Sequence, residues 1–509
     1  MYYYHCFYIA RLNFMKKVSK LIFVPLLLLG IMGISAHLVS KNKQQNRAQI
    51  AKKYCSNCHL FPAPTLLSKK IWLESVLPEM GHRMGVGDRN ALLNRMSFHQ
   101  FQRLCNMGIY PEKSIISKSD WQQLVRYYIE NAPNEMPESL SKPTIKFIKN
   151  PFSVLTPAVK SLNSGQTTSV RFVPATKEIW IGKYNRQMEI LDLNLNLKFA
   201  KRTPGPVVAS CGDINPIFLS IGTMTPNEDE EGILYQQDFK NQQFKALATG
   251  LRRPVSFETA DLNQDTISDI IIAEFGFETG QLSWINGKTK KKKRLSNLPG
   301  ARNIILEDID KDGKTDFYVL FAQANEQIVL FKNKGNEQFQ AQTILKFPSV
   351  YGSSFMEMAD LNKDGKMDII LTNGDNADYS PEAKNYHGIH VYLNKGNQQF
   401  KPIQFIAVAG ATKTISRDFD SDGHLDLATI AFFSPNDKSP SFLYFKNVGN
   451  EKFIASSLDI PKGQWMTMEA EDMDDDGDID LLLGHFTFGK FKSAPHPYPF
   501  LVLKNNTIL

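Results

Sequence analysis

The segment "DMDDDGDIDLLLGHF", residues 472–486, decides the fold of most of this 509-residue chain. Oxygen-bearing side chains stand at its positions 1, 3, 5 and 9, which are Asp472, Asp474, Asp476 and Asp480. The glycine at position 6 permits a sharp turn, and the apolar run that follows is typical of a buried strand. The segment therefore predicts an acidic loop that leads directly into a β-strand.

The same pattern occurs five times, and the copies begin at Asp261, Asp308, Asp360, Asp418 and Asp472, at intervals of 47, 52, 58 and 54 residues. A second signature follows most copies, as in "FKNKGNEQF" and "YLNKGNQQF", and two weaker units of similar size precede the first copy. Seven units of about 50 residues, each with room for four short strands, predict a seven-bladed β-propeller over residues 156–509.

The acidic loops predict bound calcium. Alternate residues of a tight loop point inward, so the side-chain oxygens converge, and several hard oxygens around one point suit Ca²⁺. An EF-hand is excluded, because its position 12 is Glu and these copies carry Ile, Val, Leu or Thr there. The predicted calcium ligands are Asp261, Asn263, Asp265, Asp269, Asp308, Asp310, Asp312, Asp316, Asp360, Asn362, Asp364, Asp368, Asp418, Asp420, Asp422, Asp426, Asp472, Asp474, Asp476 and Asp480.

These copies resemble the FG-GAP/VCBS repeats, the calcium-loop repeats of integrin-α-type propellers. The resemblance covers about residues 163–506 and rests on the five acidic motifs. It implies that the cations have a structural role, holding the blades together, and do not catalyse a reaction. The first copy departs from the pattern, because Thr266 stands where the others have glycine.

The N-terminus carries the pattern of an export signal. From Met15 it has a basic start, an apolar stretch from Leu21 to Ile34, and then small and polar residues. The residues before Met15 fit no part of such a signal, so we expect translation to start at Met15. Residues 1–40 are predicted to be a signal or a membrane anchor, and the remainder to lie in the periplasm or cell envelope.

Residues 45–135 have helical periodicity and predict a small all-α domain. Asp88 is a plausible helix cap, Ser117 or Ser119 is another, and the last helix should stop before Pro133. Residues 136–155 contain proline and serine and are interpreted as a linker.

Within the helical region, residues 54–60 read "YCSNCHL". A structural zinc site would need a second ligand pair, and a thioredoxin-like dithiol would need a βαβ context. The helical context and the export signal instead favour covalent haem c, with Cys55 and Cys58 as thioether residues and His59 as the proximal iron ligand. The other two cysteines of this region and the propeller, Cys105 and Cys211, would either pair or stay free.

A six-coordinate haem needs a second axial ligand. Met80 is favoured, because it follows an apolar helix and is expected in a loop between helices, and Met84 is the alternative. The other candidates are His82, Met96, His99 and Met107. The order of motif, helix, methionine loop and aromatic helix over about residues 46–133 resembles class I cytochrome c, and residues 58–85 resemble the cytochrome module joined to such repeats in bacterial envelope proteins.

The chain is therefore expected to be a multidomain protein, a small all-α cytochrome c-like domain followed by an all-β seven-bladed propeller. Its expected function is to carry single electrons as an exported mono-haem c-type cytochrome, with the calcium-stabilised propeller as a partner-binding scaffold. One alternative is a periplasmic oxidoreductase whose propeller binds a substrate and passes electrons to the haem. Another is an adhesion or glycan-binding propeller with a haem redox sensor.

The sequence gives little sign of a self-contained catalyst. It has no paired catalytic His and Asp, no nucleophile motif and no dinucleotide fingerprint. The expected partners are a redox protein and a polymer or glycan. The net charge of +7 includes the run "KTKKKKR" at 288–294, which is interpreted as a solvated loop and gives no indication of nucleic acid.

Overall fold

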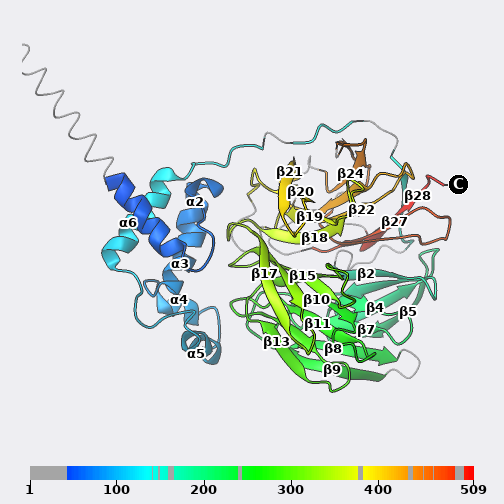
Figure 1. Ribbon diagram of the computed structural model, residues 1–509, viewed down its shortest axis with the longest axis horizontal. Helices are drawn as coiled ribbons and strands as arrows, with labels where there is room; N and C mark the ends of the chain where they lie inside the picture. The colour runs from blue at the N-terminus through cyan, green and yellow to red at the C-terminus, as the bar shows by residue number, and fades with distance from the viewer. Residues whose placement is uncertain are drawn as a thin grey trace, which may run out of the picture.

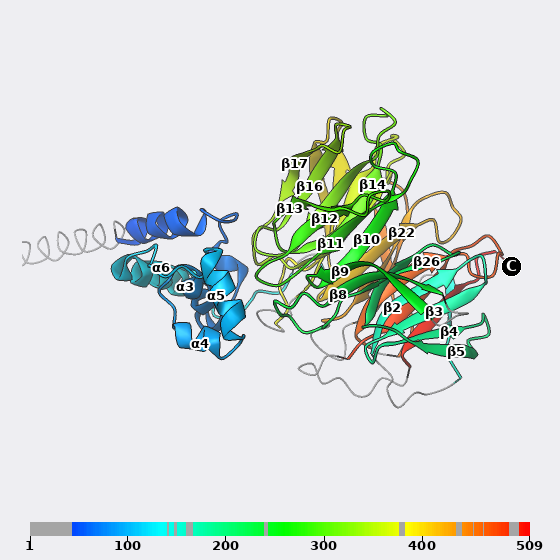
Figure 2. The same cartoon turned by 90° about the horizontal axis from the view of Figure 1, so that it is seen from below.

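A computed structural model describes residues 43–139, 142–146, 150–158, 166–238, 243–375, 382–433, 440–450, 452–461, 463–487 and 498–508. A helical unit lies against a large β-propeller (Figures 1 and 2). The predicted export signal, residues 1–40, lies outside the described residues. No helix within the described ranges is long and apolar enough to cross a membrane.

The helical unit begins with a helix over residues 43–55. The elements that follow are η1 (Pro64–Leu66), α2 (Lys69–Ile71), the π-helical turn η2 (Trp72–Val76), α3 (Leu77–Arg83), α4 (Arg89–Leu93), α5 (Phe98–Asn106) and α6 (Lys118–Asn131). Asp88 caps α4 as predicted, and of the two serines proposed for α6 it is Ser117 whose side chain caps the helix. α6 ends at Asn131, before Pro133, because a proline cannot continue the backbone hydrogen bonds.

The elements α2, η2 and α3 form one continuous helical run, and this corrects the expectation that Met80 lies in a loop. Met80 lies inside α3, two residues after Pro78. A proline in a helix lacks the amide hydrogen and crowds the carbonyl four residues before it, which is here Glu74. Glu74 belongs to the π-turn, and the wider turn lets the chain pass the proline without leaving the helix.

The core of the helical unit forms around Trp72 and Tyr128. Both side chains are at most 1% exposed, and their ring centroids lie 4.3 Å apart. The indole nitrogen of Trp72 donates to the carbonyl of Pro64 at 2.8 Å, so the buried polar atom is satisfied. Leu67 and Leu124 are fully buried in the same cluster.

The propeller consists of seven four-stranded antiparallel sheets, which confirms the predicted blade number. From inner to outer strand they are β2 (Thr167–Val173), β3 (Glu178–Lys183), β4 (Gln187–Leu191), β5 (Leu197–Arg202); β6 (Val207–Cys211), β7 (Ile217–Ser220), β8 (Gly232–Asp238), β9 (Gln243–Leu251); β10 (Pro254–Ala260), β11 (Asp269–Glu274), β12 (Gln281–Ile285), β13 (Lys292–Ser296); β14 (Ala301–Glu307), β15 (Asp316–Phe321), β16 (Gln327–Asn333), β17 (Phe339–Lys346); β18 (Ser353–Ala359), β19 (Asp368–Asn373), β20 (Gly388–Asn394), β21 (Phe400–Ala407); β22 (Ala411–Arg417), β23 (Asp426–Ala431), β24 (Phe442–Asn447), β25 (Phe453–Ser456); and β26 (Trp465–Glu471), β27 (Asp480–His485), β28 (Phe500–Asn505), β1 (Phe152–Leu155).

The inner strands form a closed ring. Each inner strand contacts the inner strands of the two neighbouring blades, and β26 of the last blade contacts β2 of the first. The two weak units before Asp261 are thus complete blades of the ring, as the spacing of the repeats predicts. The ring places the inner edge strand of each sheet beside those of its neighbours at the centre of the propeller, where it is shielded from pairing with another chain.

The last blade is built from both ends of the propeller sequence. Strand β1 pairs antiparallel with β28, with Phe152 opposite Asn505 and Leu155 opposite Val502. β1 falls in the last four residues of the predicted linker 136–155, so the propeller begins at Phe152. The Phe152 ring lies 5.4 Å from that of Phe419 in the neighbouring blade, and this contact fixes the closing strand to the core.

The two faces of the propeller carry different loops. Because strands alternate in direction within each blade, the acidic loops between first and second strands all open on one face. The loops between second and third strands, and those between blades, open on the other face. The helical unit contacts the second face, through loops such as the one between β11 and β12 that carries Glu278. The acidic loops and the helical unit therefore lie on opposite faces.

Candidate functional site

Positions 1, 3 and 5 of the acidic loops come together as the sequence predicts. In three loops the three positions are all aspartate, and one carboxylate oxygen from each lies within 4.8 Å of the others. These triads are Asp308, Asp310 and Asp312; Asp418, Asp420 and Asp422; and Asp472, Asp474 and Asp476. The other two loops have an asparagine at position 3, Asn263 and Asn362. The triads can hold a metal ion such as calcium.

The loop backbone folds around the position-1 carboxylate. Its Oδ2 accepts a hydrogen bond from the position-6 amide at 2.8–3.0 Å in all five copies. The position-5 carboxylate accepts from the position-7 amide at 2.9–3.1 Å. Position 6 has a left-handed φ, +92° at Gly477, which glycine adopts without strain. Thr266 adopts a φ of +70° there, so the first loop is strained where the other four are relaxed.

The position-9 aspartates, which the sequence predicts as ligands, lie at the start of the second strand and are at most 2% exposed. Each accepts through Oδ1 from a backbone amide across the hairpin at 2.7–2.8 Å. Burial raises the pKa of Asp426 to about 7 and that of Asp480 to about 6. These carboxylates are not among the groups whose oxygens lie within 4.8 Å of one another, so position 9 holds the hairpin together in this structure.

The asparagine of the second signature is a structural residue whose role the sequence reasoning did not assign. The amide of Asn333 donates to Asp316 at 2.7 Å, and its side chain donates to the carbonyl of Leu262 in the preceding blade at 2.8 Å. Asn505 makes the same two contacts, to Asp480 and to the carbonyl of Phe419. The sequence signal that could have assigned this role is the recurrence of the asparagine in the second signature that follows the loops.

Several loop oxygens fit a cation better than they fit a loop without one. The Oδ1 atoms of Asp420, Asp472 and Asp478 are buried and have no hydrogen-bond partner. Asp478, at position 7 of the last loop, is only 2% exposed, and its other oxygen accepts from the amides of Thr507 and Ile508. A buried carboxylate oxygen without a partner is costly, and a bound cation would satisfy it.

Residues 308–371 and 418–483 match the family of FG-GAP-like repeats. Both segments carry the FG-GAP-like repeat. Each match begins at the first aspartate of one acidic loop and ends in the second strand of the next blade, so the two matches together contain four of the five loops described above. No curated protein matches the sequence.

Several solved structures are similar to this chain at low sequence identity. The N-terminal domain of Nup159 is 11% identical, covers 72% of this chain and 99% of its own, and has a TM-score of 0.42. BBS1N in complex with ARL6DN is 9% identical, covers 70% of this chain and 97% of its own, and has a TM-score of 0.45. The Dos1 propeller is 9% identical, covers 67% of this chain and 78% of its own, and has a TM-score of 0.40. At these scores the likenesses say nothing about what the chain binds.

The cysteine motif lies in the helical unit, outside the propeller. Cys55 ends the first helix and is 8% exposed, whereas Cys58 lies in the following turn and is exposed. Cys55 belongs to the apolar cluster around Trp72 and Tyr128. The Nδ1 atom of His59 lies 3.0 Å from the carbonyl oxygen of Leu60. With Nδ1–H donating to that carbonyl, the lone pair of Nε2 is available to a ligand or metal.

The chemistry of Cys55 argues against a redox dithiol. Burial raises the pKa of the Cys55 thiol to about 11, so the thiol is protonated at neutral pH. Reactive dithiols have lowered pKa values, because the thiolate is the nucleophile. The donor set also gives zinc little support, since the only groups of three metal-ligating side chains found in the described ranges are the aspartate triads.

Cys105 and Cys211 do not form a disulfide in this structure. The Cys105 sulfur accepts from the guanidinium of Arg89 at 3.2 Å within the helical unit. The Cys211 sulfur lies 3.9 Å from the hydroxyl of Thr259 in the propeller. The sequence left open whether these two cysteines pair, and in this structure both are free thiols.

Of the axial-ligand candidates, two methionines share the cluster of Cys55. Met84 is 7% exposed and Met80 is partly buried, and both pack into that cluster. They lie four residues apart on one face of α3, and Met84 is the residue that caps its C-terminal end. The remaining candidates lie elsewhere: His82 is buried beside Gly87, Met96 packs in a separate cluster with Phe101, and His99 and Met107 are exposed.

The helical unit docks on the propeller through basic side chains that meet acidic ones. Glu278, whose side chain is 4% exposed, forms an ion pair with Arg83 and accepts from the hydroxyl of Tyr110 at 2.9 Å. Arg103 pairs with Glu230 at 3.0 Å and Glu228 at 3.3 Å. Val350, from the loop between β17 and β18, is part of the hydrophobic core of the helical unit. The two parts therefore form one packed body.

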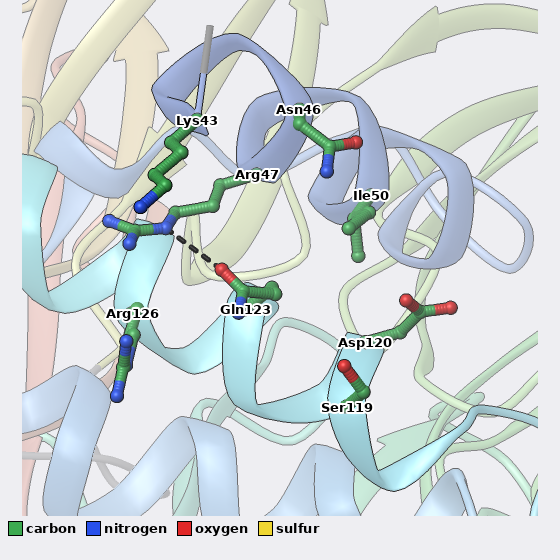
Figure 3. Close-up of a pocket in the computed structure, with 8 residues that line it drawn as sticks. All are labelled: Lys43, Asn46, Arg47, Ile50, Ser119, Asp120, Gln123 and Arg126. Atoms are coloured by element: carbon green, nitrogen blue, oxygen red, sulfur yellow. Dashed lines mark hydrogen bonds between the residues drawn. The ribbon is translucent and has the colours of Figure 1, made fainter. Parts of the chain in front are cut away.

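A polar pocket of about 300 Å³ lies between the first helix and α6 (Figure 3). Its lining residues are Lys43, Asn46, Arg47, Ile50, Ser119, Asp120, Gln123 and Arg126. Arg47 crosses it to donate to Gln123 at 2.9 Å and to pair with Glu130. Neither cysteine of the motif lines this pocket, so it is separate from the candidate haem site.

Proposed function

We propose that the chain is an exported mono-haem c-type cytochrome that carries single electrons and uses its FG-GAP propeller as a scaffold for a partner. The observation that carries the proposal is the Cys55, Cys58 and His59 motif at the end of the first helix. Its buried cysteine shares one apolar cluster with Met80 and Met84. Export from the cytoplasm agrees with covalent haem attachment, and it rests on the pattern of residues 1–40.

The residues present fit covalent haem. Cys55 and Cys58 would hold it through thioether bonds, and His59 would ligate the iron through Nε2. The haem supplies a reversible one-electron change at its iron. The carbonyl of Leu60 orients the His59 ring and fixes its tautomer. The cluster of Trp72 and Tyr128 excludes water from the Cys55 side, which favours the less charged state of a buried site.

We assign the second axial position to Met80, with Met84 as the alternative. A thioether ligand favours ferrous iron and raises the reduction potential. The two candidates can be separated by Met80→Ala and Met84→Ala, each produced with haem maturation and oxidised. The variant that lacks the true ligand loses the iron–sulfur charge-transfer band near the red end of the ferric spectrum, and the other keeps it. Loss of the band only in Met84→Ala would overturn the assignment to Met80.

Calcium in this proposal is structural. The three triads and the buried unpartnered oxygens of Asp420, Asp472 and Asp478 support cation binding on the face away from the helical unit. A cation at each loop would hold the start of the second strand of its blade. Chelation should therefore lower the melting temperature of the propeller and leave the haem spectrum unchanged.

The docking of the helical unit favours a second candidate, a periplasmic oxidoreductase. The ion pair of Arg83 with Glu278 and the packing of Val350 hold the helical unit against one face of the propeller. A substrate bound on that face would lie near an electron acceptor in the same chain. The adhesion or glycan-binding alternative has no comparable observation in its favour.

One experiment separates these functions. The chain is expressed with its export signal and haem maturation, purified, and its haem reduction is followed spectroscopically. An electron carrier is reduced only when a redox protein is added, whereas an oxidoreductase is reduced by a small substrate alone. A purified protein without covalent haem would refute the electron-transfer proposal.

A further inference from the structure

Among the five acidic loops, the residue at position 3 varies together with a residue on the neighbouring strand. The strand residue is the one opposite position 9 in the hairpin of the second and third strands. Where position 3 is Asp310, Asp420 or Asp474, the strand residue is Lys332, Lys446 or Lys504. Where position 3 is Asn263 or Asn362, the strand residue is the uncharged Asn286 or Leu393.

Each of these three lysines forms an ion pair with the aspartate at position 3 of its own loop. Lys332 pairs with Asp310, Lys446 with Asp420, and Lys504 with Asp474. Two of them also approach position 5: Lys446 lies 2.9 Å from Asp422, and Lys504 lies 3.9 Å from Asp476. The ammonium group thus sits among the oxygens that a bound cation would contact.

The presence of other lysines at the loops does not depend on which residue stands at position 3. Lys314 and Lys366 occupy position 7 and pair with the position-5 carboxylates of Asp312 and Asp364 at 2.7 and 2.9 Å. One of these loops has aspartate at position 3 and the other has asparagine. A general need for positive charge would not separate the two lysine positions, so the strand lysine has a specific relation to position 3.

We propose that Lys332, Lys446 and Lys504 are tethered counter-cations that occupy the three-aspartate loops when no divalent cation is bound, and that binding of calcium displaces them. This rests on the proposed structural role of calcium and adds how the sites are regulated. An ammonium nitrogen offers three donors to carboxylates, so it can order the loop without a metal. A calcium ion must then compete with a charge that is already in place, which weakens its affinity.

Some loop oxygens have no partner even where a strand lysine is present, and a metal ion would contact them. The Oδ1 of Asp420 and the Oδ1 of Asp472 are buried and unpartnered in loops that contain a strand lysine. Lys446 contacts the Oδ2 atoms of Asp420 and Asp422, and Lys504 contacts the Oδ2 atom of Asp474. Neither lysine satisfies the Oδ1 atoms of Asp420 and Asp472. A cation with six to eight oxygen ligands would engage them as well.

The test compares two single charge removals in the same loop of the full-length purified chain. Lys332→Leu gives the second loop the residue that the third loop carries at Leu393, and Lys314→Leu is the matched control. Calcium binding is measured by titration calorimetry and by counting bound ions with native mass spectrometry at set free calcium. We expect Lys332→Leu to tighten one site at least about tenfold and Lys314→Leu to change it by about threefold or less.

A rescue variant distinguishes displacement from a general charge effect. Asp310→Asn together with Lys332→Leu recreates the pattern of the third loop, and its melting temperature in chelator should return to that of the wild type. Lys332→Leu alone should lower the melting temperature in chelator and not in calcium. Equal affinities for Lys332→Leu and Lys314→Leu, or unchanged calcium binding in Lys332→Leu, would overturn the inference.

The outcomes also separate this inference from the proposed role of calcium. If the wild type binds calcium and Lys332→Leu binds it no better, the structural role stands and the counter-cation fails. If the wild type binds none and a triple Lys332→Leu, Lys446→Leu and Lys504→Leu variant does, the lysines are counter-cations that calcium does not displace in the native protein. If neither binds calcium, both proposals fail.

Discussion

The helical unit and the propeller place their functional groups in opposite ways. The propeller repeats one exposed acidic loop five times, and the loop oxygens are held by local backbone amides. The helical unit has one cysteine motif, and one of its cysteines is buried in the core that holds the unit together. Damage to one loop leaves four similar loops intact, whereas the helical unit has no second copy of its motif. The predictions below test that contrast.

The largest expected effect is at the single motif. The double variant Cys55→Ser and Cys58→Ser should lose all covalent haem, because no thioether can form. Haem staining after denaturing electrophoresis measures this directly. The matched control Cys105→Ser removes a thiol from the same unit and should stain like the wild type. Retention of covalent haem by the double variant would contradict the assignment of the motif.

The next effect is at the closing strand of the propeller. Phe152→Ala removes a 5% exposed ring that packs on Phe419, and it should lower the free energy of unfolding by about 3–5 kcal/mol. Ser153→Ala changes the neighbouring exposed residue of β1 and should cost less than about 0.5 kcal/mol. Urea denaturation measures both. Equal unfolding midpoints for the two variants would show that β1 does not hold the ring closed.

A titratable side chain on an inner strand gives the propeller a pH dependence. Burial raises the pKa of Glu258 on β10 from 4.5 to about 7, so the folded state favours the protonated acid. Its contribution to stability is therefore intact below pH 4.5 and declines as the pH rises toward 7. Glu258→Gln should stabilise the protein by up to about 3 kcal/mol at pH 8 and have little effect at pH 4.

The control for this prediction is Glu471→Gln, which alters an exposed carboxylate on the inner strand β26. Its unfolding midpoint should stay within about 0.5 kcal/mol of the wild type at both pH values. If Glu258→Gln stabilised the protein equally at pH 4 and pH 8, titration of Glu258 would not be the cause.

The smallest effect is expected where the two regions meet. Glu278→Gln weakens the ion pair with Arg83, whose side chain is 34% exposed, so we expect a loss of about 1–2 kcal/mol. Faster hydrogen exchange in α3 and in the loop around Glu278 measures the undocking. Glu138→Gln removes a fully exposed pair with Lys142 and should leave exchange in α3 unchanged. Exchange that stays slow in Glu278→Gln would mean that Val350 and its neighbours hold the unit without this pair.

The repeats made the propeller predictable, because the acidic loop and the apolar strand after it recur at intervals of 47 to 58 residues. The closing strand was not predictable from "FSVL", since its partner β28 is distant in sequence and four residues carry no turn signal. Met80 was expected in a loop because Pro78 reads as a helix break, and only the π-turn before it shows why the helix continues. The pairing of Arg83 with Glu278 depends on how two domains meet, which no local pattern encodes.

The candidate sites divide in the same way. Positions 1, 3 and 5 could be predicted because the spacing alone makes them converge. The role of position 9 in holding the hairpin together could not be predicted, because it depends on a backbone amide of the third strand that donates to Asp316 or Asp480. The haem proposal still rests on the motif and its surroundings, because the second axial ligand depends on which methionine faces the iron.

The pairing of β1 with β28 also has a consequence for biosynthesis. A ribosome completes β1 long before β28, so Phe152 can pair with Asn505 only after the strands between them have been synthesised. A chain that is truncated before residue 500 lacks β28 and leaves β1 without its partner strand. The outer strand of the last blade therefore finds its partner only after β28 has been synthesised.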